Sequence, residues 1–173
     1  MKINFLRILI ILVLIFVILT FFFALKKDNF YTTEDLVESE INNFNLSSLN
    51  SSELIKRDDL RENNFTLINF FASWCSPCRK EHKHLINLQK KNKNIKILGI
   101  NFKDKKNNAL KFLDELGDPY YFVAKDVDGK ESVKFGIFGI PESILINKEL
   151  KIIKKIIGPI NENTFNQILE KTN

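Results

Sequence analysis

The sequence predicts an α/β domain in which a mixed sheet is flanked by helices, preceded by one N-terminal transmembrane helix. The domain is predicted by short apolar runs that alternate with longer amphipathic segments, and by two apolar runs near the carboxyl end separated by a polar turn. The membrane helix is predicted by eighteen consecutive uncharged residues near the amino terminus. The chain therefore divides into a signal anchor (1–27), a polar tether (28–38) and one domain (39–173).

Composition excludes a disordered chain and a basic, nucleic-acid-binding domain. Of the 173 residues, 45% are hydrophobic and 27% are charged, which is typical of globular proteins. The net charge of +5 comes mainly from Lys2, Arg7, Lys26 and Lys27, which all precede the first acidic residue, Asp28. Without these four, 22 basic residues stand against 21 acidic ones. The domain is nearly neutral, so we expect no nucleic-acid partner.

The uncharged run from Ile8 to Leu25 predicts an uncleaved signal anchor that spans a membrane at about residues 5–25. At 1.5 Å per residue the run measures about 27 Å, close to a hydrocarbon core of about 30 Å. A cleaved signal peptide is the main alternative, but its apolar region is shorter and ends in a small-x-small site. The second alternative to a signal anchor is a buried helix of a soluble protein. Basic residues on both sides leave the orientation open.

Strands and helices alternate after the tether. The predicted strands are short apolar runs, at 44–46, 66–71, 95–100, 120–124, 143–146 and 150–157. The predicted helices carry apolar residues three or four positions apart, at 77–91, 105–116 and 161–171. The first strand alternates as an edge strand does, Gly117 is a C-cap, and Asn161 or Asn163 is an N-cap. This order, with a hairpin at 143–157, predicts helices on both faces of the sheet.

Both cysteines of the chain lie in W-C-S-P-C, residues 74–78, between a predicted strand and a predicted helix. Pro77 suits a first helical position, because its φ is fixed and it lacks the N–H that would be unpaired there. Cys75 then lies just before the helix, where free N–H groups and the helix dipole favour a thiolate. The pattern predicts a redox-active pair, with Cys75 as the nucleophile and Cys78, one turn on, as the resolving thiol.

The cysteine pair also has other possible uses. A structural disulfide is one, although a bond between residues three apart constrains little chain entropy. Covalent haem attachment requires C-x-x-C-H, and Arg79 stands where the histidine would be. A metal site could recruit His82, on the same helical side as Cys78, but His84 is rotated by about 200° from His82. We therefore expect no metal ligand and no cofactor, with both histidines on a solvated helix face.

Glu81 falls on the apolar stripe of the same helix, between Cys78 and Leu85. A carboxylate there would be partly buried beside the thiols, so that burial would raise its pKa and let it exchange a proton with the resolving cysteine. In the alternative, the side chain reaches solvent or pairs with Lys80 or Lys83.

Pro141 precedes an apolar strand in G-I-P-E, residues 139–142, and proline is confined to the first residue or the edge of a strand ladder. It is either an ordinary turn proline or part of a cis Ile140–Pro141 bond. A cis bond opposite the thiols would leave the Ile140 backbone free to pair with an extended client peptide.

Four segments, L-I-N-F-F-A-S-W-C-S-P-C-R-K-E-H, G-I-N-F-K-D, L-D-E-L-G-D-P-Y and F-G-I-F-G-I-P-E-S, together resemble one family. It is the DsbE family, the membrane-anchored thioredoxin-like thiol–disulfide oxidoreductases of cytochrome c biogenesis. The resemblance covers about residues 39–171, and C-R-x-E-H and G-x-P-E make it more specific than W-C-x-x-C alone. It implies a thioredoxin fold with a strand–helix insertion at about 105–124 and a cis bond before Pro141.

The resemblance also implies roles for single residues. Cys75 would be the nucleophile, Cys78 the resolving thiol, and Glu81 and Glu142 the acidic residues near the site. Thioredoxins in general carry a buried aspartate six residues before the first cysteine, where this chain has Asn69, which leaves Glu81 as the proton carrier. The surface that binds the client is expected to comprise Trp74, Ile140, Pro141 and Glu142.

The function implied by the resemblance is reduction of a disulfide in apocytochrome c, or in a partner thiol protein, before haem attachment. A membrane protein that relays electrons would re-reduce the cysteine pair. Such a reductase belongs on the oxidising side of the bacterial inner membrane, with a cytoplasmic amino terminus and a periplasmic domain. One alternative is a reductase for another periplasmic client, such as a copper-site assembly protein. Another is a non-enzymatic module that binds metal or haem through its thiols.

Overall fold

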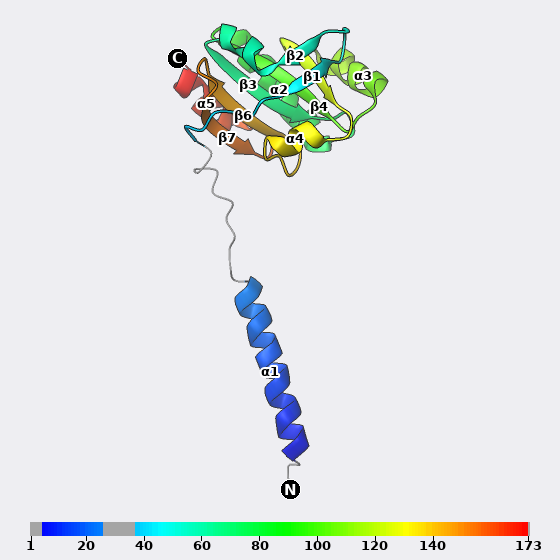
Figure 1. Ribbon diagram of the computed structural model, residues 1–173, viewed down its shortest axis with the longest axis vertical. Helices are drawn as coiled ribbons and strands as arrows, with labels where there is room; N and C mark the ends of the chain where they lie inside the picture. The colour runs from blue at the N-terminus through cyan, green and yellow to red at the C-terminus, as the bar shows by residue number, and fades with distance from the viewer. Residues whose placement is uncertain (1–4, 26–36, 173) are drawn as a thin grey trace. The chain divides into compact units, whose positions relative to one another are not determined.

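The computed structural model describes residues 5–25 and 37–172 (Figure 1), and in the first segment it describes side chains from 7 to 23. The helix α1 (Phe5–Leu25) and the domain belong to two compact units, and each is described by itself. Most of the predicted tether, residues 28–36, lies outside the described residues.

Helix α1 coincides with the apolar run that predicts an anchor. Its large described side chains, from Ile8 to Phe23, are all at least 44% exposed. Among the described residues, however, no helix is both long and apolar enough to cross a membrane. The transmembrane helix predicted at about 5–25 is therefore not confirmed.

Within residues 37–172 the domain is built on a seven-stranded mixed sheet in the order β2-β1-β5-β4-β3-β6-β7 (Figure 1). β3, β4 and β5 run parallel, and the remaining pairs are antiparallel. The strands are β1 (Asn45–Ser48), β2 (Leu54–Lys56), β3 (Phe65–Phe71), β4 (Ile95–Phe102), β5 (Phe122–Asp126), β6 (Glu142–Asn147) and β7 (Ile152–Ile157). The helices are η2 (Arg57–Glu62), α2 (Ser76–Lys91), α3 (Lys106–Leu116), α4 (Lys130–Lys134) and α5 (Glu162–Thr172).

The two faces of the sheet are covered by different elements. On one face, Leu67 of β3 shares an apolar cluster with Leu85 of α2 and Phe165 of α5. On the other face, Phe70 of β3 packs with Phe135, which directly follows α4, and with residues 41–60. Odd and even residues of β3 therefore point to opposite faces, as the pleat requires. The predicted mixed sheet with helices on both faces is confirmed.

Three features of the fold differ from the prediction. β1 is not an edge strand, because the three-residue strand β2 pairs with its outer side. The short segments η2 and α4 were not predicted, since a segment of five or six residues with one apolar side chain shows no helical periodicity. β5 begins at Phe122, and this leaves Tyr120 in the loop that follows Gly117, whose φ of +86° ends α3 as a C-cap.

Candidate active site

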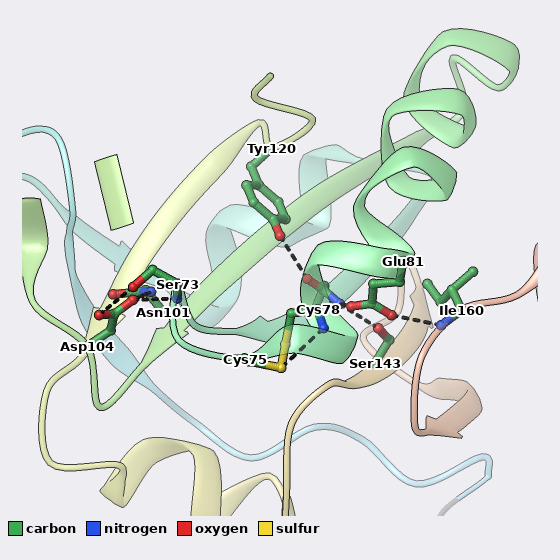
Figure 2. Close-up of a disulfide and its surroundings, with 10 residues drawn as sticks. Ser73, Cys75, Cys78, Glu81, Asn101, Asp104, Tyr120, Ser143 and Ile160 are labelled. Carbon is green, nitrogen blue, oxygen red and sulfur yellow. Dashed lines mark hydrogen bonds between the residues drawn. A yellow bond between two sulfur atoms is a disulfide. The ribbon is translucent and has the colours of Figure 1, made fainter. Parts of the chain in front are cut away.

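Cys75 and Cys78 form a disulfide at the start of α2, with an S–S distance of 2.06 Å (Figure 2). Cys75 is the N-cap residue, and its Sγ accepts a hydrogen bond from the Cys78 backbone N–H at 3.2 Å. The sulfur thus lies where free N–H groups and the helix dipole stabilise an anion. Both residues lie just beneath the surface, Cys75 4% and Cys78 1% exposed.

The segment before the disulfide is fixed to the loop after β4. Asp104 accepts hydrogen bonds from the Ser73 backbone N–H at 2.6 Å and the Ser73 hydroxyl at 3.0 Å, and from Asn101 Nδ2 at 3.2 Å (Figure 2). The Trp74 indole N–H donates to the Lys103 carbonyl at 3.2 Å, while its side chain stays 59% exposed. This loop therefore holds the Trp74 ring in the solvent next to the disulfide.

The Ile140–Pro141 bond is cis, as the resemblance implies. Ile140 is half-buried and packs against the apolar cluster that contains both cysteines. It lies outside the ladder of β6, which begins at Glu142. Phe138, two residues earlier, is 74% exposed. The segment before Pro141 therefore combines a residue packed beside the disulfide with an exposed aromatic ring.

Glu81 is 1% exposed, and both of its carboxylate oxygens accept hydrogen bonds from neutral groups. Asn69 Nδ2 donates to Oε1 at 2.9 Å, and the Ile160 backbone N–H donates to Oε2 at 2.8 Å (Figure 2). Burial raises the pKa of Glu81 from 4.5 to about 7, and the bonds from Ile160 and Asn69 limit this rise. The prediction that Glu81 is buried is therefore confirmed. The alternative, in which the side chain reaches solvent or pairs with Lys80 or Lys83, is wrong.

His82 is not on a solvated helix face, and this prediction was wrong. The residue is 2% exposed, and its Nε2 lies 2.8 Å from the Gly117 carbonyl oxygen, so this nitrogen carries the proton. Burial lowers the pKa of His82, while the Gly117 carbonyl and the charge of Asp118 oppose this effect. Phe112 of α3 and Gly117, which ends that helix, cover this side of α2, and a helical pattern alone could not show it.

Glu142 is 4% exposed, and its carboxylate lies away from the solvent. Its Oε1 accepts hydrogen bonds from the backbone N–H groups of Phe138 at 3.1 Å and Gly139 at 3.0 Å. Its Oε2 lies 3.3 Å from Lys155 Nζ, which also donates to the Gly136 carbonyl. Glu142 therefore shapes the segment before Pro141 and is too buried to be the client contact that was predicted.

The structure separates the predicted site residues into those that pack at the disulfide and two buried glutamates. Cys75, Cys78 and Ile140 share one apolar cluster. Glu81 and Glu142 are buried in separate hydrogen-bond networks. Within the described residues, no group of three or more His, Cys, Asp or Glu side chains is arranged to hold a metal ion.

Sequence patterns missed the partners of the two glutamates. Tyr120 and Ser143 belong to the network around Glu81, and Lys155 pairs with Glu142. Only Lys155 left a signal, because a charged residue in the apolar run of β7 must either be paired or reach solvent.

Comparison with known proteins identifies the class. The profile of the Redoxin family matches residues 36–170, so the chain belongs to the Redoxin family of thioredoxin-like proteins. Within it, the chain belongs to the DsbE family. It is 31% identical over 144 residues to the thiol:disulfide interchange protein DsbE of Allochromatium vinosum, a match that covers 83% of this chain and 79% of that protein.

Other relatives agree with this assignment. The thiol:disulfide interchange protein CycY of Rhizobium leguminosarum is 48% identical over 94 residues, 54% of this chain and 50% of CycY. HelX of Rhodobacter capsulatus is 38% identical over 112 residues, 65% of this chain and 62% of HelX. The chain therefore matches about half of the length of CycY and less than two thirds of the length of HelX. A crystal structure described as DsbE from Chlorobium tepidum superposes with a TM-score of 0.70 at 26% identity, covering 79% of this chain and 98% of that one.

Proposed function

We propose that this protein is a thiol–disulfide oxidoreductase that reduces a disulfide in a client protein. The observation that carries the proposal is the Cys75–Cys78 pair, with Cys75 capping α2 and accepting the Cys78 N–H. A sulfur in this position is favoured as a thiolate, and the thiolate is the form that attacks a disulfide. The names of the relatives, thiol:disulfide interchange proteins, support the same chemistry.

The reaction begins with the reduced pair. The Cys75 thiolate attacks one sulfur of the client disulfide, so that a mixed disulfide forms and the other client sulfur leaves as a thiolate. Cys78 then loses its proton and attacks Cys75 Sγ, which forms the Cys75–Cys78 bond and releases the second client thiol. Two electrons pass from the cysteine pair to the client, and a reduced thiol protein must restore the pair.

Glu81 is the residue that we assign to the proton of Cys78. It lies one helical turn after Cys78, its carboxylate is buried, and its pKa of about 7 lies between the pKa values of an ordinary carboxyl and an ordinary thiol. A base matched in this way takes up a proton at neutral pH and returns it without a large barrier.

Client binding is assigned to the surface around the cis bond. Trp74 and Phe138 are exposed aromatic side chains, and Ile140 lies between the disulfide and the first residue of β6. An extended peptide could pair with the Ile140 backbone and place its own disulfide opposite Cys75. A hollow beside Trp74, lined by Lys103, Lys105 and Val127 among others, extends this surface.

The client that we propose is apocytochrome c or a partner thiol protein of cytochrome c maturation, on the basis of the DsbE resemblance. The pair would be restored by a membrane thiol protein, and the domain would work in the periplasm. We also propose that the apolar run from Ile8 to Leu25 attaches the protein to the inner membrane. Alkaline extraction of membranes tests this, because full-length protein should stay in the pellet. A soluble form that begins near Leu25 would show a cleaved signal peptide.

Alkylation of the reduced protein tests the roles of the cysteines. Cys75 should react faster than Cys78 below pH 8, because the start of the helix stabilises its thiolate. Equal rates, or a faster Cys78, would overturn the assignment.

Trapping identifies the client. A Cys78→Ala variant keeps the attacking thiolate but cannot resolve the mixed disulfide, so a client should remain attached to Cys75 and be identifiable by mass spectrometry. A Cys75→Ala variant is the matched control and should trap nothing. A copper-site protein on Cys75 would replace the proposed client with the alternative one.

A further inference from the structure

Tyr120 is a polar side chain that the function described so far does not use. Its hydroxyl donates to Asn69 Oδ1 at 2.9 Å, and Asn69 Nδ2 in turn donates to Glu81 Oε1 at 2.9 Å (Figure 2). A continuous chain of two hydrogen bonds therefore joins the loop before β5 to the buried carboxylate. Each group along this chain donates to the next one, and the last donates to Glu81.

The backbone is built to let the Tyr120 ring reach this position. Asn69 of β3 is the direct neighbour of Gly99 in β4, and the ring lies over Gly99. A Cβ atom at residue 99 would lie 2.8 Å from the ring, which is closer than real contacts allow. The ring also stacks on Phe71, with centroids 4.9 Å apart. The Tyr120 hydroxyl is therefore aimed at Asn69 by packing on both sides of the ring.

The electrostatic surroundings of Glu81 make this donor chain important. Asn69 and Ser143, from β3 and β6, are neutral, and the segment after β7 contributes only the Ile160 N–H. On α2 itself, His82 faces Gly117 and the cysteine pair lies one turn earlier. Burial and the charge of Glu81 raise the pKa of Tyr120, so its hydroxyl keeps its proton and remains a donor.

We propose that Tyr120 and Asn69 are positioning residues, which hold Glu81 in the ionised form that accepts the proton of Cys78. The hydrogen bond from Tyr120 polarises the Asn69 amide and keeps its oxygen turned away from Glu81. Without the hydroxyl, the amide is a weaker donor. Its bond from Nδ2 to Ser143 remains, but the bond from Tyr120 that also keeps its oxygen away from Glu81 is lost, which favours a protonated carboxyl. This proposal rests on the proton-carrying role of Glu81 in the proposed function.

The test compares Tyr120→Phe with Tyr121→Phe in the full-length protein in detergent. Both variants lose one hydroxyl, but Tyr121 is 55% exposed and outside the network. Titration of the Glu81 carboxyl by ¹³C NMR in the oxidised protein should show a midpoint about 0.5 pH unit higher in Tyr120→Phe, since one hydrogen bond is worth about that much. The midpoint of Tyr121→Phe should match that of the wild type, and unfolding curves verify that both variants are folded.

Disulfide exchange measured against pH supplies the second readout. The rise in rate near pH 7 should move upward by the same amount in Tyr120→Phe and in Gly99→Ala, which displaces the same ring. In a Glu81→Gln background, Tyr120→Phe should have no further effect on the profile. A Tyr120→Phe protein with an unchanged Glu81 midpoint overturns the positioning role alone. A Glu81→Gln protein with an unchanged pH profile overturns the proton-carrying role itself.

Discussion

Two buried glutamates near the disulfide differ in the charge of their partners. Glu81 lies among neutral polar groups on the sheet face covered by α2. Asn69 donates to it there, and Ser143 accepts a second hydrogen bond from Asn69. Glu142 precedes Ser143 in β6, so it points to the opposite face, where it lies 3.3 Å from Lys155 Nζ. Burial is nearly equal, 1% and 4% exposed. A buried carboxylate without a cation can change its protonation near neutral pH, whereas an ion pair holds a loop in shape.

The difference also separates two duties around the disulfide. Glu81 is the residue that we propose moves a proton during exchange. Glu142 and Lys155 hold the segment from Gly136 to Gly139, and with it the exposed ring of Phe138 before the cis bond. In the function that we propose, the same residue type would therefore serve proton transfer on one face of the sheet and would support the client-binding segment on the other.

The largest expected effect comes from breaking the ion pair. Lys155→Met leaves the Glu142 carboxylate buried without its cation, so the free energy of unfolding should fall by about 3–5 kcal/mol in urea titrations. Lys148→Met is the matched control, because Lys148 lies exposed in the turn between β6 and β7 and should change stability little.

The double variant Lys155→Met/Glu142→Gln should recover part of the loss, because it removes the uncompensated charge. If Lys155→Met is as stable as Lys148→Met, the ion pair is not what holds the segment before Pro141.

The next effect is the contribution of Glu81 to the pH dependence of stability. Its pKa of about 7 in the folded protein is raised above the unfolded value of 4.5. The stabilising contribution is therefore complete below about pH 4.5 and is lost as the pH rises through 7, at most about 3 kcal/mol. Urea titrations of the oxidised protein at pH 5 and pH 8 isolate this effect by comparison, because the lowered pKa of His82, which favours stability at the higher pH, is common to all variants. Relative to Glu81→Gln, the wild type and Glu142→Gln should lose stability on going from pH 5 to pH 8.

A third, smaller effect concerns the thiols. Glu81→Gln removes a negative charge near the cysteine pair, so the thiolate absorbance of the reduced protein should titrate about one pH unit lower. Exchange with a disulfide substrate should slow by about 10²-fold at most, since one general base is lost. Glu142→Gln should leave the thiolate titration unchanged. If Glu81→Gln and the wild type have identical titrations and rates, Glu81 has a structural role only and does not carry the proton.

The sequence predicts those features of the fold and the site that depend on the local periodicity of apolar residues. The strand and helix pattern located β3, β4, β6, β7, α2, α3 and α5 to within two residues. The helical stripe through Cys78 and Leu85 also predicts correctly that Glu81 is buried, because residues three or four apart share a face of a helix. The position of Cys75 just before the helix follows from Pro77 in the same way.

The partners of the buried polar residues depend on contacts between segments that are distant in the sequence. Lys155 reaches Glu142 through the pairing of β6 with β7, and Tyr120 reaches Asn69 only because the ring crosses β4 at Gly99. His82 is buried because the loop at Gly117 folds onto α2. Nothing in the local spacing of these residues encodes such neighbours, so patterns of exposure on single elements could not predict them.

The smallest effect concerns the second donor to Glu81, the Ile160 N–H. Asn161, the next residue, precedes α5, and its Oδ1 accepts the Thr164 backbone N–H at 3.0 Å, which confirms it as the cap. Asn161→Ala should lower the free energy of unfolding by about 1 kcal/mol, and Asn161→Ser, which can still cap, by less. If the cap also fixes the Ile160 N–H on Glu81, the loss in Asn161→Ala should be greater at pH 8 than at pH 5, because the bond is stronger to the ionised carboxylate. An equal loss at both pH values would show that the first turn of α5 and the Glu81 site are independent.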